Sequence, residues 1–304
     1  MLYLLKRAFQ TLLVLFLVGT IAFAALHLAG DPVSLLVAED ATPIQREDLR
    51  RAYGLEQSVI AQYFIFLKKA AVGDLGNSFY SSRPAMPLLL ERLPATLQLV
   101  SVGLGLALLL GVPLGISSAI RIGTAFDRQL QTITAILISA PTFWIGILLI
   151  QIFAVQWRVL PSQGSGTIAH LILPAMTLAL PRAAVYTQML RVLLLEVLSQ
   201  DFIRTAHAKG VYGRRVVYNH ALRNALVPFV TVLGLQFAGL LSGAVITESL
   251  FAYPGMNRVA LEAIGRLDIP VILAFVLLSA LIYASVNFLT DVAYVLIDPR
   301  VRYD

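Results

Sequence analysis

A polar, basic stretch between two long apolar segments carries the residue types best suited to binding another molecule. Residues 201–210 read Asp-Phe-Ile-Arg-Thr-Ala-His-Ala-Lys-Gly, and further basic residues follow up to Arg223. Helix-forming residues from Phe202 to Lys209 predict a short helix whose small side chains give it a low-profile face. Such a face can enter a groove of a partner protein, while basic side chains supply polar contacts at the rim. The residues that we assign to this docking function are Arg204, Thr205, Ala206, Ala208, Lys209 and Gly210.

A solvated basic loop that only fixes the orientation of the chain in a membrane is the alternative interpretation. Two observations favour docking: loop 199–224 is much longer than a connection between two helices needs, and it has the helical pattern just described. The two interpretations differ at Gly210. A bulky replacement there disturbs a packed interface, but it leaves a solvated loop nearly unchanged.

The sequence has no pattern typical of catalysis, nucleotide binding or metal binding. There is no cysteine, which excludes disulfides and thiolate chemistry. There is no Gly-x-x-x-x-Gly-Lys-Ser/Thr loop, so ATP and Mg²⁺ would be bound by separate subunits. The four histidines are scattered without the spacing of metal ligands. We therefore predict a chain that is not an enzyme itself and holds no cofactor or metal.

The elements that must position the polar stretch are long and apolar. Hydrophobic residues make up 58% of the chain and charged residues 13%, and the mean hydropathy of +0.81 lies outside the range of soluble domains. A helix needs roughly 20 apolar residues to cross a bilayer. The sequence therefore predicts an all-α, polytopic membrane protein with six transmembrane helices. The spans are expected at about 8–28, 94–117, 130–155, 171–195, 225–247 and 270–296.

The net charge of +6 is distributed unevenly along the chain. Lysines and arginines concentrate near the N-terminus, in two loops and at the C-terminus, which is typical of cytoplasmic segments. This distribution predicts that both termini are cytoplasmic, and it disfavours a nucleic-acid-binding face. The first apolar run exceeds the roughly 7–15 residues of a signal peptide, so we expect it to remain as the first helix. The basic residues concerned are Lys6, Arg7, Arg121, Arg128, the cluster at 204–223, Arg300 and Arg302.

Two segments outside the spans contain signals for short helices rather than for a separate domain. In segment 29–93 we predict one helix over 42–54 and a second, amphipathic one over 57–71. Segment 248–269 has a Pro254-Gly255 turn followed by a helix. Both segments are too small to be stable alone, so we expect them to pack on the ends of the spans.

Prolines and glycines recur inside the predicted spans. Proline kinks or breaks a helix, whereas glycine lets two helix backbones approach closely. Ordinary packing in a bundle explains both, and so does a pathway whose helices bend and slide; the sequence leaves both open. The residues are Pro113, Pro141, Pro174, Pro181, Gly103, Gly105, Gly111, Gly115, Gly234, Gly239 and Gly243.

Three ionisable residues lie in or near the spans, where an unpaired charge is costly. Arg182 is our candidate for a residue that lines a solute pathway. Arg191 is close enough to the cytoplasmic surface for its side chain to reach water. Asp291 lies seven residues before Asp298, and we expect a structural ion pair there.

The polar stretch and its surroundings resemble the membrane subunits of binding-protein-dependent ABC importers of the dipeptide, oligopeptide and nickel type. The resemblance rests on residues 201–210 and on the later pattern His-Ala-Leu-Arg-Asn-Ala-Leu-x-Pro, which ends at Pro228. Phe202 and His207 depart mildly from the family pattern. Other family motifs occur in the family's order along almost the whole chain: Gly30-Asp-Pro32, Gly73-Asp-Leu-Gly76, Leu93-Pro-Ala-Thr-Leu97, Ile172-Leu-Pro-Ala175, Thr247-Glu-Ser-Leu-Phe251, Tyr253-Pro-Gly255 and Asp298-Pro-Arg300.

The resemblance implies the type I permease fold, with one transmembrane domain of residues 1–304 and loop 199–224 as its coupling loop. It implies the first of two homologous permeases in a bacterial inner membrane. The partners would be the second permease, two ATP-binding subunits and an extracytoplasmic solute-binding protein. ATP hydrolysis in the separate subunits would drive the import of peptides or a related small solute.

Two other classes of function can be compared with this one. A stand-alone secondary transporter needs acidic residues near mid-membrane, and only the off-centre Asp291 is available. A non-transport scaffold has no need of kinked, glycine-rich spans. Co-purification with an ATPase would separate the importer from both. The solute stays open among dipeptides, oligopeptides, glutathione, nickel chelates, haem and sugars, because the binding protein makes the selection in this family.

Overall fold

The computed structural model describes residues 2–29 and 57–297, so the helix predicted over 42–54 lies outside the described residues. The chain forms two compact units. Unit 1 comprises residues 1–94 and 255–285, and unit 2 comprises residues 95–254 and 286–304. The assignment of residues 1–304 to one domain stays a prediction.

Unit 1 contains the first and last long helices and two short ones. Ser58 caps the N-terminus of α4, since its hydroxyl accepts a hydrogen bond from the Ala61 N–H at 3.4 Å. The chain leaves α4 through Gly73 at φ +75°, a conformation that suits glycine. The helices predicted over 57–71 and after Pro254-Gly255 are thereby confirmed. The elements are α1 (Leu2–Ala29), α4 (Val59–Ala71), the start of α5 (Ala85–Ile120), α11 (Met256–Gly265) and α12 (Ile269–Ile297) up to residue 285.

Apolar residues of α5, α11 and α12 form the core of unit 1. Residues 77–84, which we call the strap, make polar contacts with the turn between α11 and α12. The Ser78 hydroxyl donates to Asp268 Oδ2 at 2.5 Å, and the Phe79 N–H donates to Asp268 Oδ1 at 3.1 Å. The Tyr80 hydroxyl donates to the Arg266 carbonyl at 2.9 Å. The two predicted extramembrane segments therefore pack on each other. The buried core residues are Ala85, Leu89, Met256, Ala263, Val271, Ala274 and Leu278.

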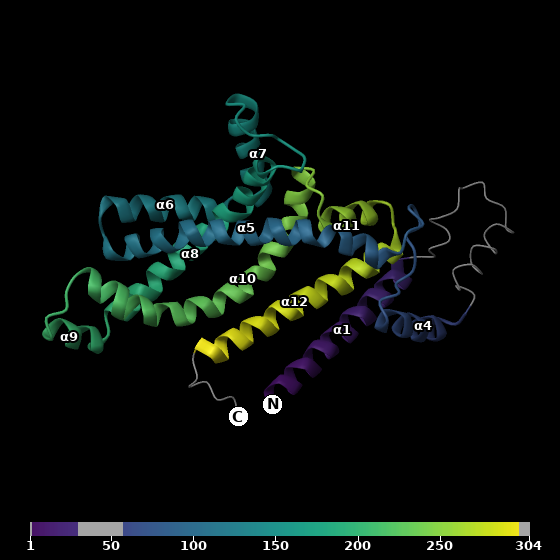
Figure 1. Cartoon of the computed structure of the whole chain (residues 1–304), viewed down its shortest axis with the longest axis horizontal. Helices are drawn as coiled ribbons and strands as arrows, with labels where there is room; N and C mark the ends of the chain where they lie inside the picture. The colour runs from purple at the N-terminus through teal and green to yellow at the C-terminus, as the bar shows by residue number, and fades with distance from the viewer. Residues whose placement is uncertain (1, 30–56, 298–304) are drawn as a thin grey trace. The chain divides into compact units, whose positions relative to one another are not determined.

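Unit 2 is organised around α8, against which α6, α7 and α10 pack (Figure 1). Tyr186, Leu190 and Leu194 of α8 are completely buried, so this helix supplies much of the apolar core. The elements are the remainder of α5, α6 (Ala125–Ser139), α7 (Thr142–Leu149), η1 (Ile150–Gln156), α8 (Ile168–Leu198), α9 (Asp201–Ala208), η2 (Val216–Ala221) and α10 (Leu222–Leu250).

Glycines on α5 let its backbone touch that of α8. A Cβ at Gly111 would lie 2.8 Å from the Ala183 carbonyl oxygen, and one at Gly115 would lie 2.9 Å from that of Thr187. Real Cβ atoms do not approach so closely, so only glycine fits at both positions. The prediction that these two glycines permit close helix packing is confirmed. Gly105, in contrast, faces open space within the described part of the chain.

The predicted span 130–155 is not one continuous helix, which corrects the sequence-based interpretation. It is broken at Ala140-Pro141, where α6 ends and α7 begins, and the two helices are bent by 106° (Figure 1). Proline has no N–H to continue the helical hydrogen bonds, which accounts for the break. Pro174 and Pro181 have a milder effect, because α8 continues as one helix through both.

All six predicted spans coincide with helices. Within the described residues, α5, α8 and α12 are long and apolar enough to cross a membrane, and α6 with α7 and η1 makes a fourth span if the bent pair counts as one. The described apolar parts of α1 and α10 are shorter, Phe9–Ala25 and Gly239–Leu250. The described residues form no β-strand, so the fold is all-α and polytopic.

Candidate functional site

The predicted docking helix exists as α9, and it is carried directly on the end of α8 (Figure 1). Only Ser199 and Gln200 separate the two helices. The Ser199 N–H donates to the Glu196 carbonyl at 3.2 Å, and the Ile203 N–H donates to the Gln200 carbonyl at 3.1 Å. A connection this short and this well bonded holds α9 directly at the end of α8.

One face of α9 is buried against its own chain. Ile203 is 2% exposed and belongs to the same apolar cluster as Leu194 of α8 and Val216 of η2. Ala206, one turn further along, is 8% exposed. Ala206, a member of the predicted docking set, therefore lies on the anchored side of the helix.

The other predicted docking residues lie on the solvent side of α9 and its following turn. Arg204 has a side chain that is 80% exposed, and it pairs at 3.2 Å with Asp201, one turn earlier, whose side chain is 91% exposed. Phe202 adds a partly exposed aromatic ring beside them. A basic and aromatic face of this kind is typical of protein interfaces. The exposed members of the predicted set are Arg204, Thr205, Ala208, Lys209 and Gly210.

Gly210 ends α9 in a Schellman motif. Its φ of +81° is left-handed, its N–H donates to the His207 carbonyl at 2.9 Å, and the Val211 N–H donates to the Ala206 carbonyl at 3.1 Å. A Cβ on Gly210 would meet nothing within 4 Å in this chain. The backbone conformation therefore requires glycine here, whereas the sequence argument had relied on its small size.

The segment after Gly210 is ordered by aromatic contacts and leads into a wide helix. The His207 and Tyr212 rings stack with centroids 5.5 Å apart and planes at 13°. The Arg214 guanidinium lies 6.0 Å from the centre of the Tyr218 ring. The following η2 is a π-helix, a form that often marks functional positions.

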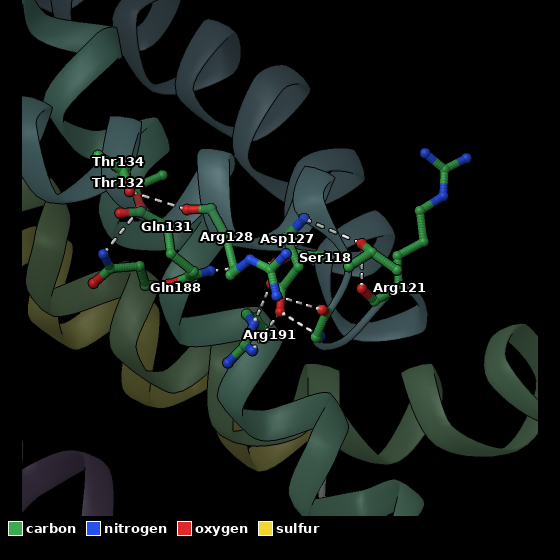
Figure 2. Close-up of polar contacts among 11 residues, drawn as sticks. Ser118, Arg121, Asp127, Arg128, Gln131, Thr132, Thr134, Gln188 and Arg191 are labelled. Carbon is green, nitrogen blue, oxygen red and sulfur yellow. Dashed lines mark hydrogen bonds and ion pairs between the residues drawn. The ribbon is translucent and has the colours of Figure 1, made fainter.

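A buried ion pair fixes the end of α8 that carries α9 (Figure 2). Arg191 Nε donates to Asp127 Oδ1 and Arg191 Nη2 donates to Asp127 Oδ2, both at 2.8 Å. The side chains are 19% and 4% exposed, respectively. The expectation that Arg191 reaches out to water is therefore wrong, because its guanidinium forms a bidentate pair with a carboxylate from α6.

Asp127 receives further hydrogen bonds in the first turn of α6, ahead of the predicted apolar span. The Ser118 hydroxyl of α5 donates to it at 2.6 Å, and the Gly123 N–H donates at 3.0 Å. These contacts, with the Arg191 guanidinium foremost, hold the pKa of the Asp127 carboxyl well below its usual range. The sequence analysis missed this residue. Thr124, which caps α6, marks Asp127 as a first-turn acid, but nothing in the sequence marks Arg191 as its partner.

The network continues away from the ion pair through amide side chains. Gln131 Nε2 donates to the Ser118 hydroxyl at 3.2 Å, and Gln188 Nε2 donates to the Thr134 hydroxyl at 3.0 Å. Figure 2 shows these side chains bridging the facing surfaces of the helices. Three helices, α5, α6 and α8, are therefore tied together where α8 approaches α9.

Arg182 has a different environment. Its Nη1 donates to Gln236 Oε1 of α10 at 2.6 Å. It lines a cavity of about 230 Å³ bounded by α8, α10 and the α6–α7 break. The structure thus places the predicted pathway residue beside a cavity and leaves it about two and a half helical turns from Arg191. The side chain of Asp291 lies outside the part of the chain whose side chains are described.

The sequence matches a known family over nearly its whole length. The family model described as binding-protein-dependent transport system inner membrane component matches residues 111–303. The model of the N-terminal part of such membrane components matches residues 1–100.

Curated relatives and solved structures agree with this match. The chain is 39% identical over 310 residues to a probable peptide ABC transporter permease of Sinorhizobium fredii, with 99% of each chain covered. It is 38% identical over 302 residues to the glutathione transport system permease GsiC of Escherichia coli K12, again with 99% coverage of each. Its fold resembles a chain of the inward-facing MetNI methionine ABC transporter, with a TM-score of 0.60 at 20% identity, covering 70% of this chain and 97% of the other.

Proposed function

From the premise that this chain belongs to the binding-protein-dependent transport system inner membrane components, we propose that it is the permease half through which peptides or closely related small solutes enter the cell. As a member of this family it is a membrane-embedded permease subunit of an ABC importer and not a stand-alone transporter. The solute class follows from two similar relatives, which are named for peptide and glutathione transport.

The geometry of α9 is the observation that carries the coupling part of the proposal. The helix is exposed on one side, anchored on the other through Ile203, and joined to α8 by two residues. A partner that grips the exposed side would therefore move α8 and the helices tied to it. Energy enters the permease at this loop, with Arg204, Thr205, Ala208, Lys209 and Gly210 as the contacting set.

The partners that we propose follow from this arrangement. The family works with ATP-binding subunits and a solute-binding protein. For this chain we propose two ATP-binding subunits, a second homologous permease and an extracytoplasmic binding protein. ATP and Mg²⁺ are bound by the ATP-binding subunits, so this chain needs no cofactor. Both termini and loop 199–224 face the cytoplasm in this assignment.

Transport then proceeds as a cycle of two conformations. ATP binding closes the ATP-binding subunits and draws the coupling helices together, which turns the permease from inward-facing to outward-facing. The binding protein releases solute into the cavity, and hydrolysis resets the complex. The role of α8 in this cycle is to carry the displacement of α9 toward the membrane.

Retention of the ATP-binding subunits by the purified permease tests the coupling assignment. Arg204→Glu reverses a charge on the exposed side of α9 without touching Ile203. We expect about tenfold weaker retention, equivalent to about 1.4 kcal/mol. The matched control is Arg121→Glu, at another exposed arginine, whose side chain lies over the Phe126 ring on the other basic loop. Equal retention by both variants, or equal loss, would contradict the assignment.

Two substitutions at Gly210 separate its conformation from its size. Asparagine tolerates the left-handed conformation better than alanine does, although it is larger. If the cap positions α9, Gly210→Asn retains the ATP-binding subunits better than Gly210→Ala. If small size at the interface is the requirement, the order is reversed.

A further inference from the structure

The guanidinium of Arg182 occupies a niche that α10 provides for it. Gln236 accepts one hydrogen bond from Nη1 at 2.6 Å. One turn further along α10, a Cβ at position 239 would lie 2.6 Å from Nη2, so a larger residue than glycine would displace the guanidinium from this position. The niche thus combines a hydrogen-bond acceptor with a stretch of helix backbone that carries no side chain. Both features hold the charged group at the edge of the cavity rather than at the end of a freely moving chain.

The charge of Arg182 has no carboxylate partner within ion-pair distance in the part of the chain that the structure describes. The only partner found there is the neutral amide of Gln236. A charged side chain within a span is costly, and it is retained where it pairs or serves a pathway. Arg191 on the same helix meets the first condition through Asp127. Arg182 meets the second, because it faces a cavity.

The cavity beside Arg182 is suited to one end of a small organic anion. Its volume of about 230 Å³ is below the roughly 300–1,000 Å³ of sites that enclose a whole drug-sized ligand. Of the described residues that line it, Arg182 is the only charged one, and Leu178, Val185 and Leu240 make the walls apolar. An anionic group with an apolar neighbour matches this lining.

The α6–α7 break adds a second positive feature to the same cavity. Thr142, the first residue of α7, lines it together with Ala140. The first N–H groups of a helix have no acceptor inside the helix, and that end of the helix dipole is positive. Arg182 and the start of α7 therefore both favour an anion in the cavity.

We propose that Arg182 binds a carboxylate group of the solute as it passes through the permease, with the start of α7 as the second element of the site. This inference rests on the proposed function, because it assigns the chemistry of the solute that the importer carries. The class is a small solute with a free carboxylate and an apolar group next to it, as in a peptide with a free C-terminus. Arg182 is a binding residue here, and Gln236 and Gly239 position it.

The absence of cysteine from this chain makes a direct test possible. A single cysteine is introduced by Thr142→Cys, and the permease complex is purified with its ATP-binding subunits. Modification rates are measured for three methanethiosulfonates, bearing a carboxyethyl, a methyl or an aminoethyl group. The carboxyethyl reagent carries the proposed anion itself, so the test needs no knowledge of the natural solute. Ser81→Cys, on an exposed position outside the cavity, is the control.

We expect the carboxyethyl reagent to react faster with the Thr142→Cys thiol, relative to the aminoethyl reagent, when Arg182 is present. Arg182→Gln, which keeps a hydrogen-bonding side chain, should lower this ratio about tenfold, and Arg182→Lys should preserve most of it. The ratio at the control position should not change. An unchanged ratio in Arg182→Gln overturns the proposal, and so does a Thr142→Cys thiol that none of the reagents modifies.

Retention of the ATP-binding subunits is measured on the same preparations. Loss of retention in all variants, with the reagent preference intact, would count against the proposed coupling function alone. Loss of the preference with full retention is the outcome expected for Arg182→Gln. The two proposals therefore fail in distinguishable ways.

Discussion

Two arginines of α8, nine residues apart in the sequence, lie in two contrasting regions of unit 2. Arg191 is bound by both oxygens of Asp127 and joins three helices where α8 meets α9. Arg182 has a single amide partner and faces a cavity. The residue type and the helix are the same, so the partner alone decides whether the charge fastens the structure or stays available to a ligand.

The contrast divides α8 into an end fastened by an ion pair and a middle that lines a cavity. At the fastened end, Gly115 and Thr187 bring the backbones of α5 and α8 into contact. In the middle, Gly239 makes room for a flexible side chain.

Removing the charge of Arg191 should have the largest effect on stability. Arg191→Gln leaves the Asp127 carboxylate buried without its cation, which costs about 3–5 kcal/mol for a fully buried pair and toward the lower end here, because Arg191 is 19% exposed. Arg182→Gln should cost less than about 1 kcal/mol, because the amide can still bond to Gln236. Unfolding of the purified permease, followed by heat or denaturant, measures both.

A double variant serves as the control for this prediction. Asp127→Asn combined with Arg191→Gln removes both charges, so it should recover part of the stability lost in Arg191→Gln. If Arg182→Gln and Arg191→Gln destabilise the protein equally, the division between a fastened and an available arginine is wrong.

Two glycine substitutions should have effects of intermediate size, and they test the same contrast between the two regions of α8. Gly111→Ala places a methyl group 2.8 Å from a backbone oxygen of α8, which cannot move aside, and overpacking of this kind costs about 1–3 kcal/mol. Gly239→Ala meets only the end of the Arg182 side chain, at 2.6 Å, so its cost in stability should be smaller. Its main effect should be a loss of the preference for the carboxyethyl reagent in the Thr142→Cys background. A larger loss of stability from Gly239→Ala would contradict this order.

The smallest expected effect is the pH dependence of the stability that the ion pair between Asp127 and Arg191 contributes. The folded-state pKa of Asp127 lies below its ordinary value of 3.8, so its ionised form stabilises the fold above that value and the contribution is lost only as the pH falls below it. The difference in stability between the natural chain and Asp127→Asn should therefore stay constant from roughly pH 5.5 to 8.5. Thermal unfolding at several pH values measures it. A difference that shrinks within this window would mean that the pair is not permanently charged.

Most helices of the fold could be predicted, because their signals are local. Apolar runs identify the long helices, and the glycine and proline turns place the ends of α4 and α11. The angle at Pro141 could not be predicted. Proline explains that the helix breaks, but the direction of α7 depends on its packing against α8 and α10.

The site was predicted in part, for the same physical reason. The position of α9 and the exposure of Arg204 follow from the polar pattern. Ile203 and Ala206 are three positions apart, so they share one face of α9, and this face is buried in the structure. The partner of Arg191 lies 64 residues away in the sequence, and only the packing of α6 on α8 brings the two together.

The strap of unit 1 can form its hydrogen bonds to Asp268 only late in synthesis. Ser78 and Asp268 are 190 residues apart, so the hydroxyl of Ser78 and the N–H of Phe79 wait for their acceptor while all of residues 95–254 are made. At about 5–20 residues per second, this interval lasts roughly 10–40 seconds. During that time water or an insertion factor has to satisfy these groups. A nascent chain that stalls before Asp268 therefore lacks the acceptor for both groups.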